Sequence, residues 1–179
     1  MVLGNDIIKA KNLKFDNISL GLPRVIVHCQ DNVTLSVMYN SDSLTIQLPR
    51  CQIFEGLYES NGKFYSELLV PYDGIAANTY RSLTETFEKL VKRDRRFEHC
   101  FFSGHISKSQ QDCACLRVKL PQNRSQVLTD VWDSNGKRLS LSSYVKGVSI
   151  VPIVSIEYVY VVENVIGCNL LLQQVVVVS

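Results

Sequence analysis

The sequence has few of the residues, and none of the short motifs, on which most enzymes depend. Only three histidines are present in the 179 residues, namely His28, His99 and His105. No P-loop, dinucleotide-binding glycine pattern, nucleophile elbow or zinc-protease helix occurs. Acidic pairs such as Glu55 and Glu59 are explained better by a solvated face than by paired catalytic carboxylates. We therefore expect a protein that is not an enzyme and that uses no cofactor.

The sequence also lacks a strong net charge and a long uninterrupted apolar run. Its formal net charge is +2, so no whole-molecule field draws it to polyanions, and any electrostatic site must be local. The most apolar stretch, from Val145 to Ile166, is interrupted by Lys146, Pro152, Glu157 and Glu163. Charges near the centre of a bilayer are costly. This stretch is therefore not expected to span a membrane, and we expect no membrane partner.

A secretion signal is not recognisable at the start of the chain. Residues Met1 to Lys9 contain neither a basic region followed by an apolar core nor a small-residue cleavage site. We therefore expect an intracellular protein. Its six cysteines should then be thiols rather than a disulfide framework.

What the sequence does contain is the pattern of a β-rich globular protein. With 46% hydrophobic residues, the chain is long enough for one well-buried core, and we expect one domain over residues 1–179. β-Branched and aromatic residues gather in short runs, with Asn61-Gly62 as the sharpest turn signal between them. In the first part of the chain these runs are Val25 to Cys29, Val33 to Met38, Leu44 to Leu48, and Phe64 to Val70.

One segment changes from strand periodicity to helical periodicity. Between residues 79 and 96 the apolar side chains recur at helical spacing, and Ser82 followed by Glu85 is typical of a capping box. The spacing predicts one main α-helix over about 79–96. Basic residues at its end suit the negative end of the helix dipole, and this explains them without a ligand.

The second half of the chain returns to strand patterns. From Cys113 to Leu120 apolar residues alternate with a face that carries Arg117 and Lys119. Asp133 to Gly136 predicts a hairpin turn, and three runs between Val148 and Val178 should form a meander. The residues thus predict a mainly β fold, a partly closed antiparallel barrel or sandwich capped by one helix.

Two patterns of chemistry-bearing side chains remain open. Five residues that zinc accepts as ligands lie close together, but their spacing is irregular, so we expect no metal site; they are His99, Cys100, His105, Cys113 and Cys115. The stretch from Lys89 to Arg124 contains nine basic residues and only three acidic ones. This local excess indicates a phosphate-binding groove if the face of Arg117 and Lys119 adjoins the hairpin of Lys137 and Arg138.

Aromatic side chains would supply the base-stacking platforms of such a groove. The candidates are Trp132, Tyr144, Tyr158 and Tyr160. The opposing interpretation is that about half of these aromatics belong to the core and that the charges form an ordinary solvated face. Sequence spacing alone favours this second interpretation.

The order of motifs resembles a family of single-stranded DNA-binding proteins of nucleocytoplasmic large DNA viruses, relatives of the phage replication type. The closing part of the pattern is an aromatic at Tyr160, Gly167 seven residues later, and Leu172-Gln173 before a last strand. The earlier motifs are LTIQLPR at 44–50, FEGLY at 54–58, LRVKLP at 116–121, VWDSNGK at 131–137 and YVKG at 144–147.

The resemblance implies an OB-like barrel that coats single-stranded DNA during replication or repair, without sequence preference. The protein would then work in the host cytoplasm or nucleus, or in the virion. The nucleic-acid-binding residues carried over, together with Arg138 of the same hairpin, are Arg117, Lys119, Trp132, Lys137, Lys146 and Tyr160. Two features depart from the pattern. Tyr160 stands where tryptophan is more usual, and the chain ends in an apolar run instead of an acidic tail. That run should pair as a strand.

Two other functions are compatible with the same patterns. One is a virion structural protein, such as a minor capsid or cementing component, that uses a related β-barrel. The other is an RNA-binding module, which differs only in contacts to 2′-hydroxyl groups. A homo-oligomer or other viral proteins are possible partners in each case.

Overall fold

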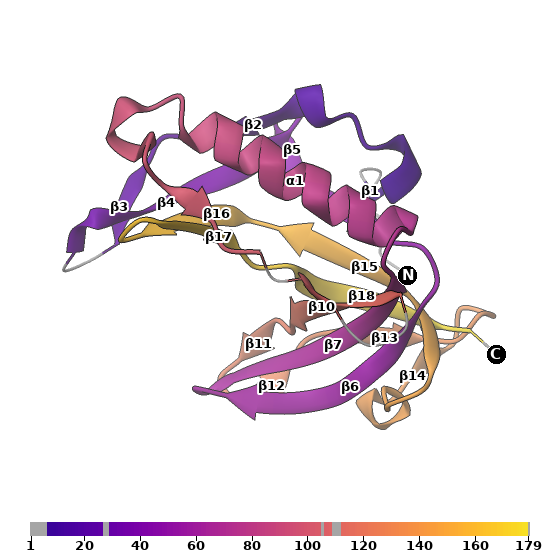
Figure 1. The fold of residues 1–179 in the computed structure, drawn as a ribbon. Helices are drawn as coiled ribbons and strands as arrows, with labels where there is room; N and C mark the ends of the chain where they lie inside the picture. Colours follow the sequence, from indigo (N-terminus) through magenta and orange to yellow (C-terminus); the bar gives the residue numbers. More distant parts are fainter. Residues whose placement is uncertain (1–6, 27–28, 105, 109–111, 179) are drawn as a thin grey trace.

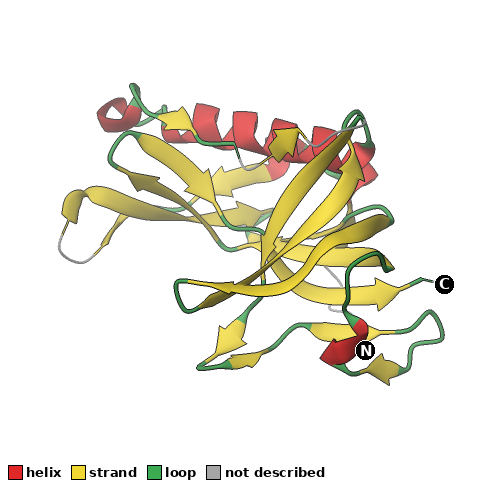
Figure 2. Cartoon of the chain, turned by 60° about the horizontal axis from the view of Figure 1, so that its bottom comes forward, coloured by secondary structure: helices red, strands yellow, loops and turns green. Residues whose placement is uncertain are grey.

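The computed structural model describes residues 7–26, 29–104, 106–108 and 112–178. It consists mainly of β-strands, with one α-helix lying along one side of the strand layer and β6 and β7 on the other side (Figure 1, Figure 2). The predicted mainly β class with one main helix is thus confirmed. No helix in the described part of the chain is long and apolar enough to cross a membrane.

Five of the strands close into a barrel. In ring order they are β6 (Cys51–Ser60), β7 (Lys63–Pro71), β10 (Cys113–Lys119), β18 (Leu171–Val177) and β15 (Ser149–Ile156), and β15 pairs again with β6. The contact between β10 and β18 is parallel, whereas the other contacts of the ring are antiparallel. The barrel is OB-like, as predicted, and its ring is closed rather than partly open.

Alternating side chains explain why β7 and β10 form the wall of this barrel. Leu68, Val70, Leu116 and Val118 are almost completely buried, and they occupy one face because successive side chains of a strand point to opposite faces. The intervening side chains, Arg117 among them, lie on the outer face. The apolar and cationic faces predicted for residues 113–120 are therefore confirmed.

The first barrel strand, β6, was not predicted. Two register shifts interrupt its pairing with β7, one between Ile53 and Glu55 and one between Glu55 and Tyr58. Bulges of this kind disturb the alternation of apolar and polar residues on which a strand prediction depends. The turn that follows was predicted correctly, and Asn61 and Gly62 both have positive φ angles, 52° and 70°, as a two-residue hairpin turn requires.

Most of the remaining strands extend the sheet beyond the barrel, whereas β11 and β12 form a separate two-stranded sheet. β5 pairs with β15 and leads through β4, β16 and β17 to β8, while β13 and β14 are added beside β18. Their bounds are β1 (Ile7–Lys9), β2 (Ile18–Leu20), β3 (Arg24–Ile26), β4 (Cys29–Tyr39), β5 (Asp42–Gln47), β8 (Phe101–Phe102), β9 (Ile106–Lys108), β11 (Gln122–Asn123), β12 (Gln126–Val127), β13 (Asp130–Trp132), β14 (Arg138–Leu139), β16 (Tyr158–Val162) and β17 (Val165–Cys168). Four short 3-10 helices are η1 (Ala10–Asn12), η2 (Phe15–Asn17), η3 (Arg95–Phe97) and η4 (Leu141–Ser143).

The helix α1 (Ile75–Val91) begins and ends earlier than the predicted 79–96. Gly74 is its N-cap, and the apolar face already includes the buried Ala76 and Ala77. Ser82 therefore lies inside the helix, so the predicted capping box is wrong. Beyond the helix, the Asp94 side chain accepts a hydrogen bond from the Arg96 backbone N–H and starts η3 instead.

The predicted meander of the last strands is also wrong. After β15 the chain turns away at Glu157, whose carbonyl accepts a hydrogen bond of 2.9 Å from the Val37 N–H of β4. β16 then pairs with β4 and β17, and only β18 returns to pair with β15. The apolar end of the chain is thus paired as a strand, as expected.

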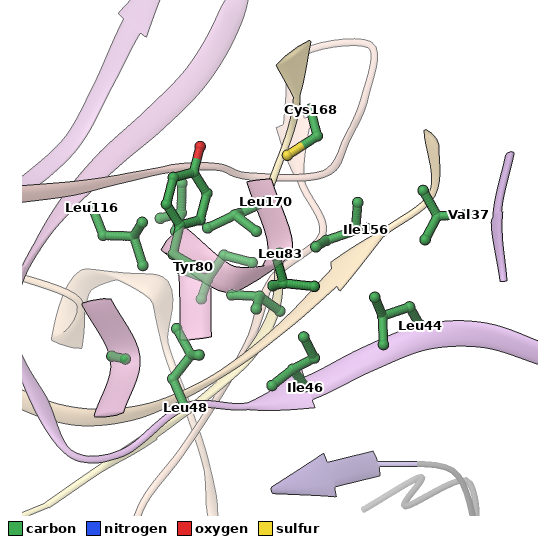
Figure 3. Packing of buried hydrophobic residues seen from close by; sticks show 14 of the residues in the cluster. Val37, Leu44, Ile46, Leu48, Tyr80, Leu83, Leu116, Ile156, Cys168 and Leu170 are labelled. Carbon is green, nitrogen blue, oxygen red and sulfur yellow. The ribbon is translucent and has the colours of Figure 1, made fainter. Parts of the chain in front are cut away.

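The core joins the helix to both parts of the sheet. Tyr80 and Leu83 project from α1 into a cluster that includes Leu116, Ile156 and Leu170 (Figure 3). These side chains are buried. The helix therefore holds the barrel strand β10 together with the β16–β17 hairpin region, and the candidate site lies where these two parts meet.

Candidate nucleic-acid interface

Aromatic and cationic side chains lie side by side on the outer face of β6, β7 and β10. In the register of these strands Tyr58 lies opposite Tyr65, and Tyr65 lies opposite Lys119. In the adjacent row Arg117 lies opposite Glu67. Opposed residues on one sheet face are close enough to interact. The strands thus place two cations beside two tyrosine rings.

Arg117 is fixed by stacking rather than by an ion pair. Its guanidinium carbon lies 4.0 Å from the centre of the Tyr65 ring and 5.9 Å from that of Tyr58, and the two rings are 6.0 Å apart. Among the residues that the structure describes, neither Arg117 nor Lys119 has an ion-pair partner. Both side chains can therefore bind an anionic ligand without first breaking an ion pair with a carboxylate.

One carboxylate lies within the same face. Glu67 accepts a hydrogen bond of 3.4 Å from the Tyr58 hydroxyl. Burial raises the pKa of Tyr58, and the charge of Arg117 opposes this shift. The Tyr58 hydroxyl is therefore neutral at physiological pH and acts as the donor to Glu67, which keeps the carboxylate in place beside Arg117.

A cavity of about 150 Å³ continues this face toward the β16–β17 hairpin. Its lining consists of Tyr65, Tyr80, Arg117, Lys119, Tyr160, Cys168, Asn169 and Leu170. The half-buried Tyr160 comes from β16 and lies opposite Gly167 of β17. A Cβ atom at residue 167 would lie only 2.4 Å from the Tyr160 ring. Gly167 is therefore required for the ring to lie across β17.

The floor of the cavity is uncharged. Burial raises the pKa of Cys168 to about 12, despite a hydrogen bond with Tyr80 that lowers it. Burial also raises the pKa of Tyr160, with smaller contributions from neighbouring groups, while Arg117 lowers it. Thiol and phenol are both protonated at neutral pH. Because a thiol, unlike a thiolate, is a weak nucleophile, the cavity is suited to binding rather than to covalent chemistry.

Lys146 lies at the far side of the same face. Its Nζ is 3.8 Å from a carboxylate oxygen of Glu55 and 5.2 Å from the centre of the Phe54 ring. Both partners belong to β6, and Glu55 lies opposite Glu67. Two glutamates therefore lie between Lys146 and Arg117, so the cationic surface is not continuous.

The β13–β14 hairpin lies elsewhere. Lys119 lies opposite Leu171 and Trp132 opposite Val176, which places Lys119 and Trp132 about 16 Å apart along the strand direction at roughly 3.3 Å per residue. β10 and β13 pair with the same edge of β18 but at different positions along it. Arg138 pairs with Asp130 at 2.5 Å. The structure therefore does not bring Trp132, Lys137 and Arg138 into one groove with Arg117.

The four aromatic side chains proposed as platforms have different environments. Tyr144 is a core residue, 3% exposed, and its hydroxyl donates a hydrogen bond of 2.8 Å to Ser66, so its assignment as a platform is wrong. The Trp132 indole N–H is buried and has no hydrogen-bond partner within the described part of the chain. Tyr158 is half-buried opposite Ser36 of β4. Only Tyr160 lines the cavity.

The histidines and cysteines considered for zinc are not gathered into a metal centre among the described residues. His99 interacts with Asn164 at 3.0 Å, Cys100 is buried at the end of the helical region, and Cys113 and Cys115 lie on β10. His105 lies outside the described residues.

Sequence reasoning missed Tyr58, Tyr65 and Asn169. Along β7 the buried residues are Ser66, Leu68 and Val70, and Tyr65 lies at an odd-numbered position before them. The alternation of buried and exposed side chains in a strand could therefore have placed Tyr65 on the outer face. Tyr58 is hidden by the bulges of β6, and Asn169 lies in a loop with no local signal. The missing information is therefore the pairing of strands that are distant in sequence.

The fold and the site together define a class of protein. Apart from Tyr58 on the first barrel strand, the candidate residues lie on the second and third barrel strands and on the connection between the fourth and fifth, the region with which OB-like barrels bind oligonucleotides and oligosaccharides. The chain is thus an OB-like barrel protein with a cationic and aromatic outer face. No family model and no curated protein matches the chain.

Proposed function

We propose that this protein binds single-stranded DNA without sequence preference and that it acts by binding rather than by catalysis. The observation that carries the proposal is the meeting of Arg117, Lys119, Tyr58, Tyr65 and Tyr160 on one face of the barrel. Unpaired cations attract phosphates, while tyrosine rings stack on bases of any sequence. The resemblance of the sequence motifs to viral single-stranded DNA-binding proteins supports the same role.

A salt titration of binding to an oligo(dT) strand tests the proposal. Each phosphate contact to a single strand contributes about −0.7 to the slope of log affinity against log salt concentration. The double variant Arg117→Ala/Lys119→Ala should therefore bind more weakly and flatten the slope by about 1.4. Lys89→Ala/Arg93→Ala, at exposed positions in the last turn of α1 and just after the helix, is the matched control with the same loss of charge. If the wild-type protein does not bind at low salt, the proposal is wrong.

Competition between strands separates DNA from RNA as the ligand. A labelled oligo(dT) strand is displaced with unlabelled oligo(dT) or oligo(U) of equal length. We expect the DNA strand to compete better. A stronger competition by RNA would transfer the role to the RNA-binding module considered above, because 2′-hydroxyl contacts distinguish the two ligands.

A structural role in a particle is the second candidate, and one observation favours it. Leu22 and Val25 are 87% and 60% exposed, and Val25 lies on β3, which pairs with β4. Exposed apolar side chains of this kind often mark a protein contact. Co-purification with particles at fixed stoichiometry, together with no affinity for nucleic acid, would support this role in place of the first.

A further inference from the structure

We infer that the cavity between Tyr65 and Tyr160 takes one unstacked nucleobase of the bound strand, while Arg117 and Lys119 hold the adjoining phosphates. This inference rests on the proposed function and specifies how the strand is held. It predicts a ligand contact in which a single base contributes most of the base-dependent affinity.

The size of the cavity suits one planar ring system. Its volume of about 150 Å³ is similar to that of a protein cavity that holds one benzene ring. The cavity is therefore too small for a stretch of folded chain. Tyr65 and Tyr160 supply aromatic surface from two different strands, and stacking on such surfaces is tolerant of base identity.

The polar groups of the cavity match a base better than they match a phosphate alone. Arg117 is exposed and stacked on Tyr65, so its charge lies over the aromatic wall, whereas the buried floor is formed by Tyr80 and the protonated Cys168. Asn169 carries an amide that both donates and accepts hydrogen bonds. Within the described ranges its side chain makes no hydrogen bond to another residue. Arg117 and Lys119, the cations of the lining, come from the outer face of β10, whereas an uncharged base edge inside the cavity would find the Asn169 amide.

Gly167 keeps this cavity in shape. The Tyr160 ring lies against residue 167 so closely that a Cβ atom there would be 2.4 Å from Cζ and the hydroxyl oxygen and 2.6 Å from Cε2. Real contacts of a Cβ atom are not that short, and all three atoms belong to the rigid phenol group of Tyr160, which can move away only as a whole. A methyl group at residue 167 would therefore displace the ring that forms one wall. Gly167 is a positioning residue for Tyr160.

The experiment compares three strands with the same number of phosphates. Oligonucleotides of about 15 nucleotides, near the upper end of OB-fold site sizes, carry no bases, one central thymine, or thymine throughout. We expect the wild-type protein to bind the one-thymine strand about tenfold more tightly than the abasic strand, as one stacked base provides. The strand with thymine throughout should bind more tightly than the one-thymine strand by less than the first thymine contributed. This comparison is made after allowing for the larger number of thymines that can enter the cavity.

Three variants locate the effect. Gly167→Ala should abolish the gain from one thymine while retaining affinity for the abasic strand, because it displaces Tyr160 and leaves Arg117 and Lys119 in place. Gly104→Ala is the control, since a Cβ atom there has no atom within 4 Å. Asn169→Ala, at a half-buried loop position, should reduce the gain by about threefold or more. It tests the cavity even if thermal unfolding shows that Gly167→Ala is not folded.

The outcomes separate the inference from the proposed function. Equal wild-type binding of the abasic and one-thymine strands, with a steep salt dependence, overturns the base cavity and leaves the single-strand binding role intact. A gain that persists in folded Gly167→Ala and in Asn169→Ala also overturns it. Failure of the wild-type protein to bind any of the three strands at low salt overturns the proposed function itself.

Discussion

At the scale of single residues, the candidate interface combines attraction and repulsion. Arg117 and Glu67 lie opposite each other on β10 and β7, so a phosphate held by Arg117 would also lie near a carboxylate. Glu67 is held there by the Tyr58 hydroxyl. This arrangement weakens the field of the face and should limit how tightly it holds a strand.

Removal of this carboxylate charge should strengthen binding. In Glu67→Gln the amide oxygen still accepts the hydrogen bond from Tyr58, while the repulsion of phosphate is lost. We expect an affinity for oligo(dT) that is about two- to fivefold higher at low salt, a gain typical of exposed charge interactions, and that shrinks as salt screens the charge. Fluorescence anisotropy titrations measure it. Glu85→Gln, exposed on α1, should have no such effect, and equal effects of the two changes would contradict the assignment.

Two buried thiols should make stability depend on alkaline pH. Burial raises the pKa of both Cys51 and Cys168 from 9.0 to about 12. Between these values the unfolded chain loses protons that the folded protein keeps, so the free energy of unfolding falls as pH rises, by up to about 1.4 kcal/mol per pH unit for each thiol. Below about pH 9 this loss is absent.

Urea unfolding at about pH 8 and about pH 10 measures this dependence. The double variant Cys51→Ala/Cys168→Ala is the comparison, because it lacks both thiols and should lose less stability between the two pH values. Whether the variant is less stable overall does not matter, since only the change with pH is compared. An identical change in both proteins would show that other groups are responsible.

At the scale of elements, the β13–β14 hairpin is the part of the predicted site that the structure separates from the rest. The sequence shows a basic hairpin with a tryptophan, but not the strands beside which it lies. β13 pairs with the same edge of β18 as β10 but farther along it, and Arg138 is paired with Asp130. The proposed contact with DNA is therefore placed on β7, β10 and the β16–β17 hairpin.

Neutralising this hairpin should leave binding nearly unchanged. We expect Lys137→Ala/Arg138→Ala to bind oligo(dT) within about twofold of the wild-type affinity at moderate salt, where screening limits long-range attraction to about 10 Å. The double variant Arg117→Ala/Lys119→Ala carries the same loss of charge and should bind much more weakly. If the hairpin variant binds as weakly as the latter, the strand must pass over β13 and β14 as well.

Local patterns account for what the sequence could predict, and long-range pairing accounts for what it could not. The alternation from Cys113 to Leu120 places Arg117 and Lys119 on one face without any tertiary information. The position of Tyr160 beside them depends on the path of β16 away from the barrel, which no local signal marks. Tyr144 shows the opposite error, since it was proposed as a stacking platform but lies in the core. Aromatic character alone does not distinguish an exposed platform from a buried tyrosine whose hydroxyl is hydrogen-bonded within the core.

At the scale of the whole molecule, the last strand holds the barrel together. β18 pairs with β15 on one side and with β10 and β13 on the other. Its residues Leu172 and Val175 are fully buried. The ring would be open without this strand, and the wall that carries Arg117 and Lys119 would lose its neighbour.

Truncation of a side chain in β18 should therefore destabilise the whole fold. Leu172→Ala removes a buried side chain that is 0% exposed, and such changes cost about 2–5 kcal/mol of unfolding free energy. Leu128→Ala, at a position that is 50% exposed, should change stability by less than about 0.5 kcal/mol. Urea unfolding monitored by circular dichroism compares the two. Similar losses in both variants would contradict the central place of β18.

The strand order of the barrel also determines when the candidate site can form. Its residues extend from Tyr58 on the first barrel strand to Asn169 just before the fifth, and the backbone N–H of Lys119 donates to the carbonyl of Leu170 across the cavity. Contacts between segments so far apart in sequence form late and slowly. A nascent or refolding chain would thus complete the candidate site only after the segment before β18 has docked, so the proposed binding of single strands would begin late in folding.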